Sequence, residues 1–264
     1  MSEFLDHFRF NQPAWLLLTL PLLLALFLRR GRGAEAAVKY FLLGSVASGF
    51  LLYGIALIYG ATGSTRLVDI ARWVSTQQSL GPMFLVGTGL LLVGFGFKIA
   101  AAPFHLWTPD VYDGAPLPIT AFMSASVKTA AFAVFARVMI EAMPGAASRW
   151  HSAMWWLAVV TMVAGNVSAL SQKNLVRLLA YSSIAHAGYL LVTIVVASTA
   201  GTTALVFYAV SYTLATMGAF GVLIIVNGGR DRSPTLDDIA GLWLVRPWLA
   251  VSMSVFMLAF MGMP

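Results

Sequence analysis

Long apolar runs, separated by short polar stretches, make up most of this chain of 264 residues. A run of about 20 apolar residues has the length of a helix that crosses a bilayer. Strands of a membrane barrel alternate apolar and polar residues over about ten positions, and these runs are longer and do not alternate. The pattern therefore predicts an all-α, polytopic membrane protein with about 7–8 transmembrane helices. The runs cover approximately residues 13–28, 38–60, 82–106, 116–140, 152–170, 178–199, 202–227 and 247–264.

The amino-acid composition agrees with a bilayer environment. The chain is 59% hydrophobic and 10% charged, whereas a soluble domain is about 25% charged. It contains no cysteine, which excludes disulfides, thiolate-bound zinc, iron–sulfur ligation and thiol catalysis in this chain. The net charge of +6 is spread over the ends of the apolar runs. We therefore expect a lipid bilayer as a partner and no nucleic acid.

The polar stretches predict one domain and an orientation. No Gly/Ser linker divides the chain, so we expect a single transmembrane domain over residues 1–264, with a short first helix and a basic loop in residues 13–33. Basic residues favour cytoplasmic loops. They concentrate in alternate loops, which places the N-terminus outside. The basic loops contain Arg29, Arg30, Arg32, Lys173, Arg177, Arg230, Arg232 and Arg246, and the opposite loops contain Arg66, Arg72 and Arg149.

Two lysines lie inside successive apolar runs, on either side of a Pro-rich break. Lys98 ends the stretch LVGFGFK, the segment IAAAPFHLWTPDVYDGAP follows, and Lys128 lies within the next run. A lysine at the centre of a membrane helix costs about 2.5–3.5 kcal/mol to insert, so it usually faces a bundle interior or a wet cavity. The hydroxyls of Ser124, Ser126 and Thr129 are typical of a hydrated lining. The alternative interpretation is that these lysines extend to the lipid headgroups. We favour a proton path that passes through both Lys98 and Lys128.

Other polar features leave two interpretations open. Glu35 and Lys39 are spaced i,i+4 on one helix face, either as a surface ion pair or as part of the proton path. His186 lies in LLAYSSIAHAGYLLV, where it is either a helix–helix contact or a proton relay among hydroxyls. The Pro-rich break also contains metal-ligand residue types, but their wide spacing disfavours a metal site. These residues are His105, Asp110 and Asp113.

Four segments together resemble one protein family. They are FKIAAAPFHLWTPDVYDGAP, SASVKTAAF, EAAVKYFLLGSVASGFLLYGIALIYGATGS and NLVRLLAYSSIAHAGYLLV. Residues 34–264 resemble subunit N of the proton-pumping NADH:quinone oxidoreductase, respiratory complex I. Related antiporter-like subunits and cation/proton antiporters share the lysines and the break. The sequence Trp-Thr-Pro-Asp-Val-Tyr within that break is more similar to subunit N than to those other proteins.

The resemblance implies a membrane-arm subunit with the antiporter-like inverted-repeat fold, in the bacterial inner membrane beside other membrane-arm subunits. It implies no redox cofactor in this chain, with NADH, FMN, iron–sulfur clusters and quinone bound elsewhere in the complex. By motif, Lys98 matches the lysine of the broken helix and Lys128 matches the lysine of the next helix. Glu35, Lys39 and His186 match further positions of the family's proton path.

The resemblance also implies that this chain is partial, because a full subunit is nearly twice as long. Leu16 lies about where the family has a glutamate that pairs with the broken-helix lysine. A second broken helix, with a further lysine, is expected beyond Pro264. We therefore expect a piece that contains the lysines of one half-channel.

Three functions follow as hypotheses. The first is a proton-translocating membrane-arm subunit that couples quinone reduction to proton transport through the buried lysines. The second is a non-conducting structural or degenerate fragment that packs in the membrane arm. The third is a cation/proton antiporter subunit, which the sequence of the Pro-rich break disfavours.

Overall fold

The computed structural model describes residues 31–230 and 232–262. Within these ranges the chain is helical, apart from turns and one isolated β-bridge between Asn174 and Thr235. The predicted all-α membrane fold is confirmed. The predicted first run, residues 13–28 with Leu16, lies outside the described residues.

Each of the seven predicted runs after residue 30 is helical over most of its length. Five described helices are long and apolar enough to cross a membrane, and α5 and α14 are apolar but shorter. The number of crossings therefore stays a prediction. The helices are α3 (Gly31–Thr62), α4 (Leu67–Thr76), α5 (Pro82–Lys98), α6 (Thr108–Gly114), α7 (Leu117–Phe122), α8 (Lys128–Arg137), α9 (Ala147–Ala169), α10 (Leu175–Val196), α11 (Thr199–Asn227), α12 (Leu236–Ile239), α13 (Leu242–Val245) and α14 (Pro247–Phe260).

The rod that contains α7 and α8 is interrupted by π-helical turns. The turn η1 (Met123–Val127) joins α7 to α8, and the turn η2 (Val138–Ala142) follows α8. A short 3₁₀ turn, η3 (Pro144–Ala146), then leads into α9. A π turn inserts one extra residue into a helix and often marks a functional site. No apolar or polar pattern in the chain indicates these turns, and η1 lies directly before Lys128.

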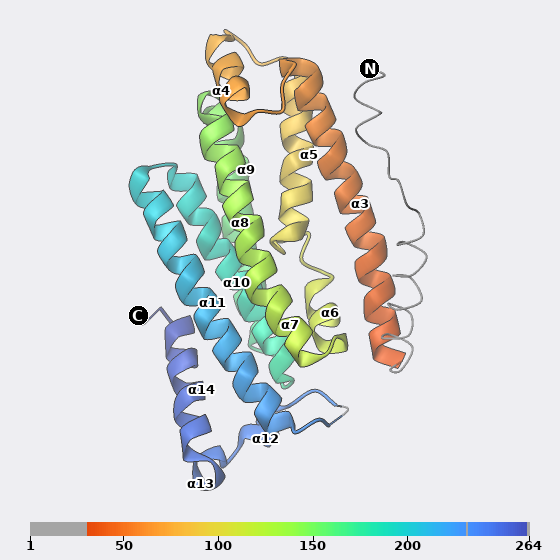
Figure 1. Ribbon diagram of the computed structural model, residues 1–264, viewed down its shortest axis with the longest axis vertical. Helices are drawn as coiled ribbons and strands as arrows, with labels where there is room; N and C mark the ends of the chain where they lie inside the picture. The colour runs from red at the N-terminus through yellow and green to blue at the C-terminus, as the bar shows by residue number, and fades with distance from the viewer. Residues whose placement is uncertain (1–30, 231, 263–264) are drawn as a thin grey trace.

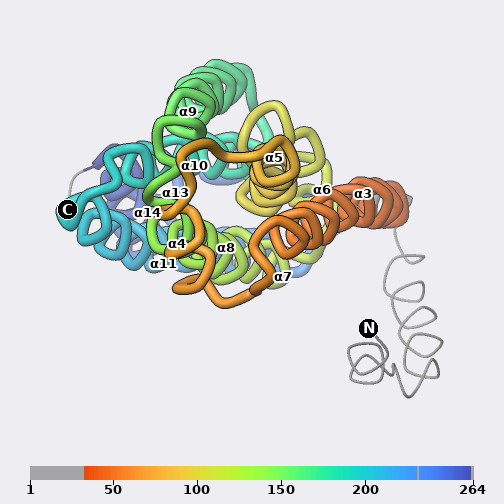
Figure 2. Tube along the Cα trace, turned by 90° about the horizontal axis from the view of Figure 1, so that it is seen from above, coloured from red at the N-terminus to blue at the C-terminus, as the bar shows by residue number. Residues whose placement is uncertain are grey.

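The long helices run up and down, so their connections fall at two ends of the bundle (Figure 1). One end holds α4, and the other holds α6, α12 and the first turn of α3. Seen along the bundle, α3 lies at one edge beside α5 (Figure 2). At another edge α9 packs closely on α10, because glycines remove the side chains between them. An added Cβ on Gly165 would lie 2.4 Å from the Ala185 nitrogen.

The break after α5 follows from its sequence. Ala100 has a left-handed backbone (φ 59°) and Pro103 has no N–H to donate, so the helix ends at Lys98. Two side chains then bind backbone groups at the break. Trp107 Nε1 donates to the Phe97 carbonyl at 3.2 Å, and Thr161 Oγ1 accepts from the Ala102 N–H at 3.0 Å. The predicted Pro-broken helix is confirmed, with α6 as its second half.

The buried apolar side chains form two clusters stacked along the bundle. One lies toward α4 and includes Phe84 and Phe135; the other lies toward α6 and includes Phe220. On α10 the second cluster ends at Ile184 and the first begins at Ala187. His186 therefore lies at the level where the two clusters meet.

Candidate functional site

Lys128 lies in the interior of the bundle at the junction of the two apolar clusters. On its own rod it falls between Ala121 of one cluster and Phe132 of the other. Its residue exposure is only 2%. The π turn η1 sets the angular position of this side chain, because one inserted residue rotates everything after it by about 100° relative to α7.

The Lys128 ammonium is held by one residue of α10. Its Nζ donates to the Ser183 carbonyl at 2.7 Å and to Ser183 Oγ at 2.5 Å. The hydroxyls close to Lys128 in sequence bond elsewhere: Ser124 Oγ donates to the Ala121 carbonyl at 3.0 Å, and Thr129 Oγ1 lies 2.9 Å from Thr213 Oγ1. The lining predicted from the neighbours of Lys128 is thus supplied mainly by another helix.

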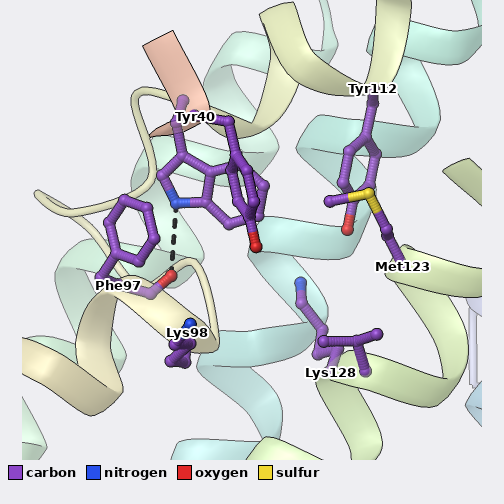
Figure 3. Close-up of a pocket in the computed structure, with 8 residues that line it drawn as sticks. Tyr40, Phe97, Lys98, Tyr112, Met123 and Lys128 are labelled. Atoms are coloured by element: carbon purple, nitrogen blue, oxygen red, sulfur yellow. Dashed lines mark hydrogen bonds between the residues drawn. The ribbon is translucent and has the colours of Figure 1, made fainter. Parts of the chain in front are cut away.

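Lys98 and Lys128 line the same small cavity (Figure 3). The figure shows the Lys128 amine and the hydroxyls of Tyr40 and Tyr112 directed into this space. Phe97 lies beside it, and its carbonyl accepts the Trp107 indole N–H. The cavity volume is about 10 Å³, which is close to the minimum for one ordered water. Lys98 is half-buried, whereas Lys128 is buried.

His186 is buried one helical turn after Ser183, on the same face of α10. Its Nδ1 is hydrogen-bonded to the Tyr208 hydroxyl of α11. Its ring also lies against the rings of Tyr212 and Phe260, with centroids 5.3 Å away in each case. Lys128 of α8 and the residues Ser183 and His186 of α10 therefore form one polar group, to which Tyr208 of α11 is hydrogen-bonded.

Glu35 and Lys39 belong to a different part of the molecule, the end that holds α6. Lys39 Nζ lies 2.6 Å from Glu35 Oε1 and 2.8 Å from Asp110 Oδ2. Asp110 Oδ1 in turn lies 2.8 Å from Arg177 Nη1. Partial burial raises the pKa of Asp110, but the hydrogen bonds from Lys39 and Arg177 outweigh it and hold that pKa below its ordinary value. This charged network fastens α3, α6 and α10 together.

The two aspartates among the metal-ligand residue types of the Pro-rich break bind other side chains. Asp113 Oδ1 accepts from Asn174 Nδ2 at 2.7 Å and from Ser233 Oγ at 2.5 Å. No group of three His, Cys, Asp or Glu side chains suited to a metal occurs among the residues that the structure describes. Asp113 thus binds the loops before α10 and α12, while Asp110 binds Lys39 of α3 and Arg177 of α10.

A family model for "NADH:quinone oxidoreductase/Mrp antiporter, TM" matches residues 14–264. The chain belongs to this family. Its cavity-lining lysines, broken helix and buried histidine are thus found in a membrane domain of the NADH:quinone oxidoreductase/Mrp antiporter family, as the sequence motifs predicted.

Individual relatives agree with this assignment. NADH-quinone oxidoreductase subunit N from Gemmatimonas aurantiaca is 76% identical over 236 residues, which are 89% of this chain and 45% of that protein. A chain of respiratory complex I from Thermus thermophilus with bound aureothin is 47% identical, with a TM-score of 0.77 over 94% of this chain and 52% of that one. The resemblance to subunit N is confirmed. The chain spans about half the length of the curated relatives it matches.

A more distant structure shows the breadth of the family fold. A chain of the Mrp complex from Dietzia sp. DQ12-45-1b has a TM-score of 0.78 at 24% identity, and the match covers 89% of this chain and 43% of that one. At this identity the likeness shows the fold alone. It agrees with the predicted antiporter-like architecture.

Sequence reasoning missed several partners of the predicted residues. Ser183, Tyr208 and Tyr212 contact Lys128 or His186, yet each is one hydroxyl among many in apolar helices. Arg177 was assigned only to orientation, and it also binds Asp110. Two signals were available in retrospect: Ser183 precedes His186 by three residues, and Tyr208 precedes Tyr212 by four.

Proposed function

We propose that this chain is a proton-translocating segment of a complex I-type membrane arm, with Lys98 and Lys128 as proton carriers. The observation that carries the proposal is Lys128 itself: a buried ammonium bound by two neutral oxygens of Ser183. Neutral acceptors stabilise a buried ammonium less than a carboxylate does. A lysine in such a setting gains or loses its proton more readily than one in a fixed ion pair.

The shared cavity supplies a way to move the proton. If both lysines carry charge, they repel each other inside a medium of low dielectric constant, where Coulomb energies are large. Arrival of a proton at Lys98 therefore favours its release from Lys128. Because Ser183 leads toward His186, the released proton continues along α10 toward the α11 and α14 side of the bundle. The roles of Lys98, Lys128 and His186 remain part of this proposal.

Glu35 and Lys39 have a supporting role in the same proposal. Their ion pairs with Asp110 hold the second half of the broken helix at one end of the bundle. That position fixes Trp107 and Tyr112, which line the lysine cavity. The wider activity belongs to the complete protein: NADH oxidation and quinone reduction elsewhere in the complex drive the transport, and neighbouring membrane-arm subunits are the partners.

Lys128→Ala tests the proposal in the membrane-embedded complex that contains this chain. We expect proton uptake into inverted vesicles, measured per NADH oxidised, to fall about tenfold, which corresponds to about 1.4 kcal/mol in a barrier. The matched control is Lys173→Ala, an exposed loop lysine that should leave the ratio unchanged. Assembly is checked by recovery of the subunit with its complex.

Two outcomes would contradict the proposal. Normal proton uptake in assembled Lys128→Ala complexes would favour the structural hypothesis, in which the segment only packs in the membrane arm. Uptake that requires sodium in the parent complex would favour the cation/proton antiporter. Loss of uptake in Lys173→Ala as well would show that the ratio reports assembly rather than the buried lysine.

A further inference from the structure

Two hydroxyls on α11 lie buried beside the polar group formed by Lys128, Ser183 and His186. Tyr212 is 5% exposed and Thr216 is 3% exposed. They are one helical turn apart and so share a face of α11. Among the described residues, the Tyr212 hydroxyl and Thr216 Oγ1 have no hydrogen-bond partner.

Buried hydroxyls without partners call for a physical reason. A hydroxyl taken out of water and left unpaired costs free energy, whereas phenylalanine and valine would fill the same spaces without that cost. Native proteins usually satisfy such atoms through side chains, backbone or an ordered water. Two of them one turn apart, within a membrane interior, provide the several polar partners that a buried water requires.

The position of this pair on α11 is fixed from two sides. Thr213 follows Tyr212 in the sequence, and Thr129 follows Lys128. The Oγ1 atoms of these two threonines lie 2.9 Å apart. The Tyr212 ring lies 5.3 Å from the His186 ring between centroids. Tyr212 therefore lies beside His186 and next to the α8–α11 contact that adjoins Lys128, with Thr216 on the same face of α11.

We propose that Tyr212 and Thr216 are positioning residues that hold a water between Ser183 and His186. A water often bridges polar groups that are near but too far apart for a direct bond. In one transfer, Lys128 gives a proton to Ser183 Oγ, which releases its own hydroxyl proton to the water. The water then releases a proton to the His186 ring. Lys128 ends neutral, His186 ends as imidazolium, and the hydroxyls and water are unchanged.

This inference rests on the proposed function, so its test uses the same vesicle assay. Thr216→Val keeps the shape of the side chain and removes the hydroxyl, and Thr216→Ser keeps the hydroxyl. We expect Thr216→Val to lower proton uptake per NADH oxidised about tenfold, and Thr216→Ser to restore most of it. The control is Thr203→Val, which removes an exposed hydroxyl from the same helix.

A second pair of variants tests the inference independently, in case the Thr216 variants do not fold. Tyr212→Phe removes the other hydroxyl while the ring stays against His186, and uptake per NADH should again fall. Tyr59→Phe, at an exposed tyrosine of α3, should leave it unchanged. A purely structural role predicts instead that the thermal midpoint falls, and that the uptake ratio stays at the parent value in whatever complex assembles.

The outcomes separate this inference from the proposed function. If Lys128→Ala loses uptake while Thr216→Val and Tyr212→Phe keep it, the water site is wrong and the lysine path stands. If Thr216→Ser is as impaired as Thr216→Val, the hydroxyl is not the cause and the inference is overturned. If Lys128→Ala itself pumps normally, the proposed function has failed first.

Discussion

At the scale of single residues, the environment of Lys128 depends on both of the helices that contribute to it. The π turn η1 rotates the lysine toward α10, and Ser183 meets it there with its carbonyl and its hydroxyl. A serine in a membrane helix usually donates back to the carbonyl four residues earlier. Ser183 accepts from Lys128 instead. The same side chain can therefore hold the ammonium and pass a proton onward.

Ser183→Ala tests this double role. The carbonyl remains to bind Lys128, so we expect the complex to assemble with its NADH oxidation intact. Loss of the hydroxyl removes one charge-assisted hydrogen bond, which is worth about 1.5–3 kcal/mol, and it also interrupts the route to His186. Proton uptake per NADH oxidised should fall about tenfold, measured in inverted vesicles. Ser182→Ala, on the neighbouring half-buried serine, is the control; equal losses in both variants would contradict a specific role for Ser183.

At the scale of helices, a glycine seam sets how close α9 lies to α10. Gly165 faces the backbone of Ala185, and Gly188 faces the Met162 nitrogen, which an added Cβ would approach to 2.8 Å. Close approach of small residues is the main packing device between membrane helices, where lipid removes the hydrophobic driving force. Because Ala185 adjoins His186, this seam also fixes the depth and rotation of the histidine.

Gly165→Ala should open the seam. The new Cβ would meet backbone atoms, which cannot rotate away as a side chain can, so α9 and α10 must separate. We expect a loss of about 1–3 kcal/mol in stability from overpacking, seen as a lower thermal midpoint in detergent. Gly221→Ala is the matched control, because an added Cβ there meets nothing within 4 Å. Alanine also favours a helix over glycine, so the control should be neutral or slightly more stable; a fall of equal size in both would contradict the seam.

The elements that the sequence predicted best are those with the strongest local signal. Uniform apolar runs located the long helices, and the Pro-rich break located the end of α5. The helix α4 was missed because it lies in a polar stretch, where only its amphipathic face, with Ile70 and Val74 buried, indicates a helix. The turn η1 was missed because a π insertion changes no apolar pattern. The pairing of Lys128 with Ser183 joins positions 55 residues apart, and a single sequence contains no direct sign of such a contact.

At the scale of the whole molecule, ion pairs occur at both ends of the bundle, the end with α6 and α12 and the end with α4. The end with α6 and α12 holds linked ion pairs, including Lys39 with Asp110 and Arg232 with Asp238 at 2.5 Å. Hydrogen bonds from Arg232 and Thr235 hold the pKa of Asp238 well below its ordinary value. That carboxylate therefore stays charged at neutral pH, and its contribution to stability is lost only as the pH falls below the ordinary range of an aspartate. The end with α4 holds Arg66 and Arg72 in looser pairs with Asp69.

These two ends make the predicted orientation measurable, with the α6 end in the cytoplasm. The chain has no cysteine, so one introduced thiol reports one position. Ser171→Cys lies in the exposed connection from α9 to α10 at the α6 end, and Ser79→Cys lies in the exposed connection from α4 to α5 at the other. We expect a membrane-impermeant maleimide to label Ser79→Cys in intact spheroplasts, and Ser171→Cys only in inverted vesicles, because basic loops resist transfer across the membrane. The reverse pattern would place the Lys39–Asp110–Arg177 network on the outside, and the direction of proton movement from Lys98 to Lys128 would then have to be reversed as well.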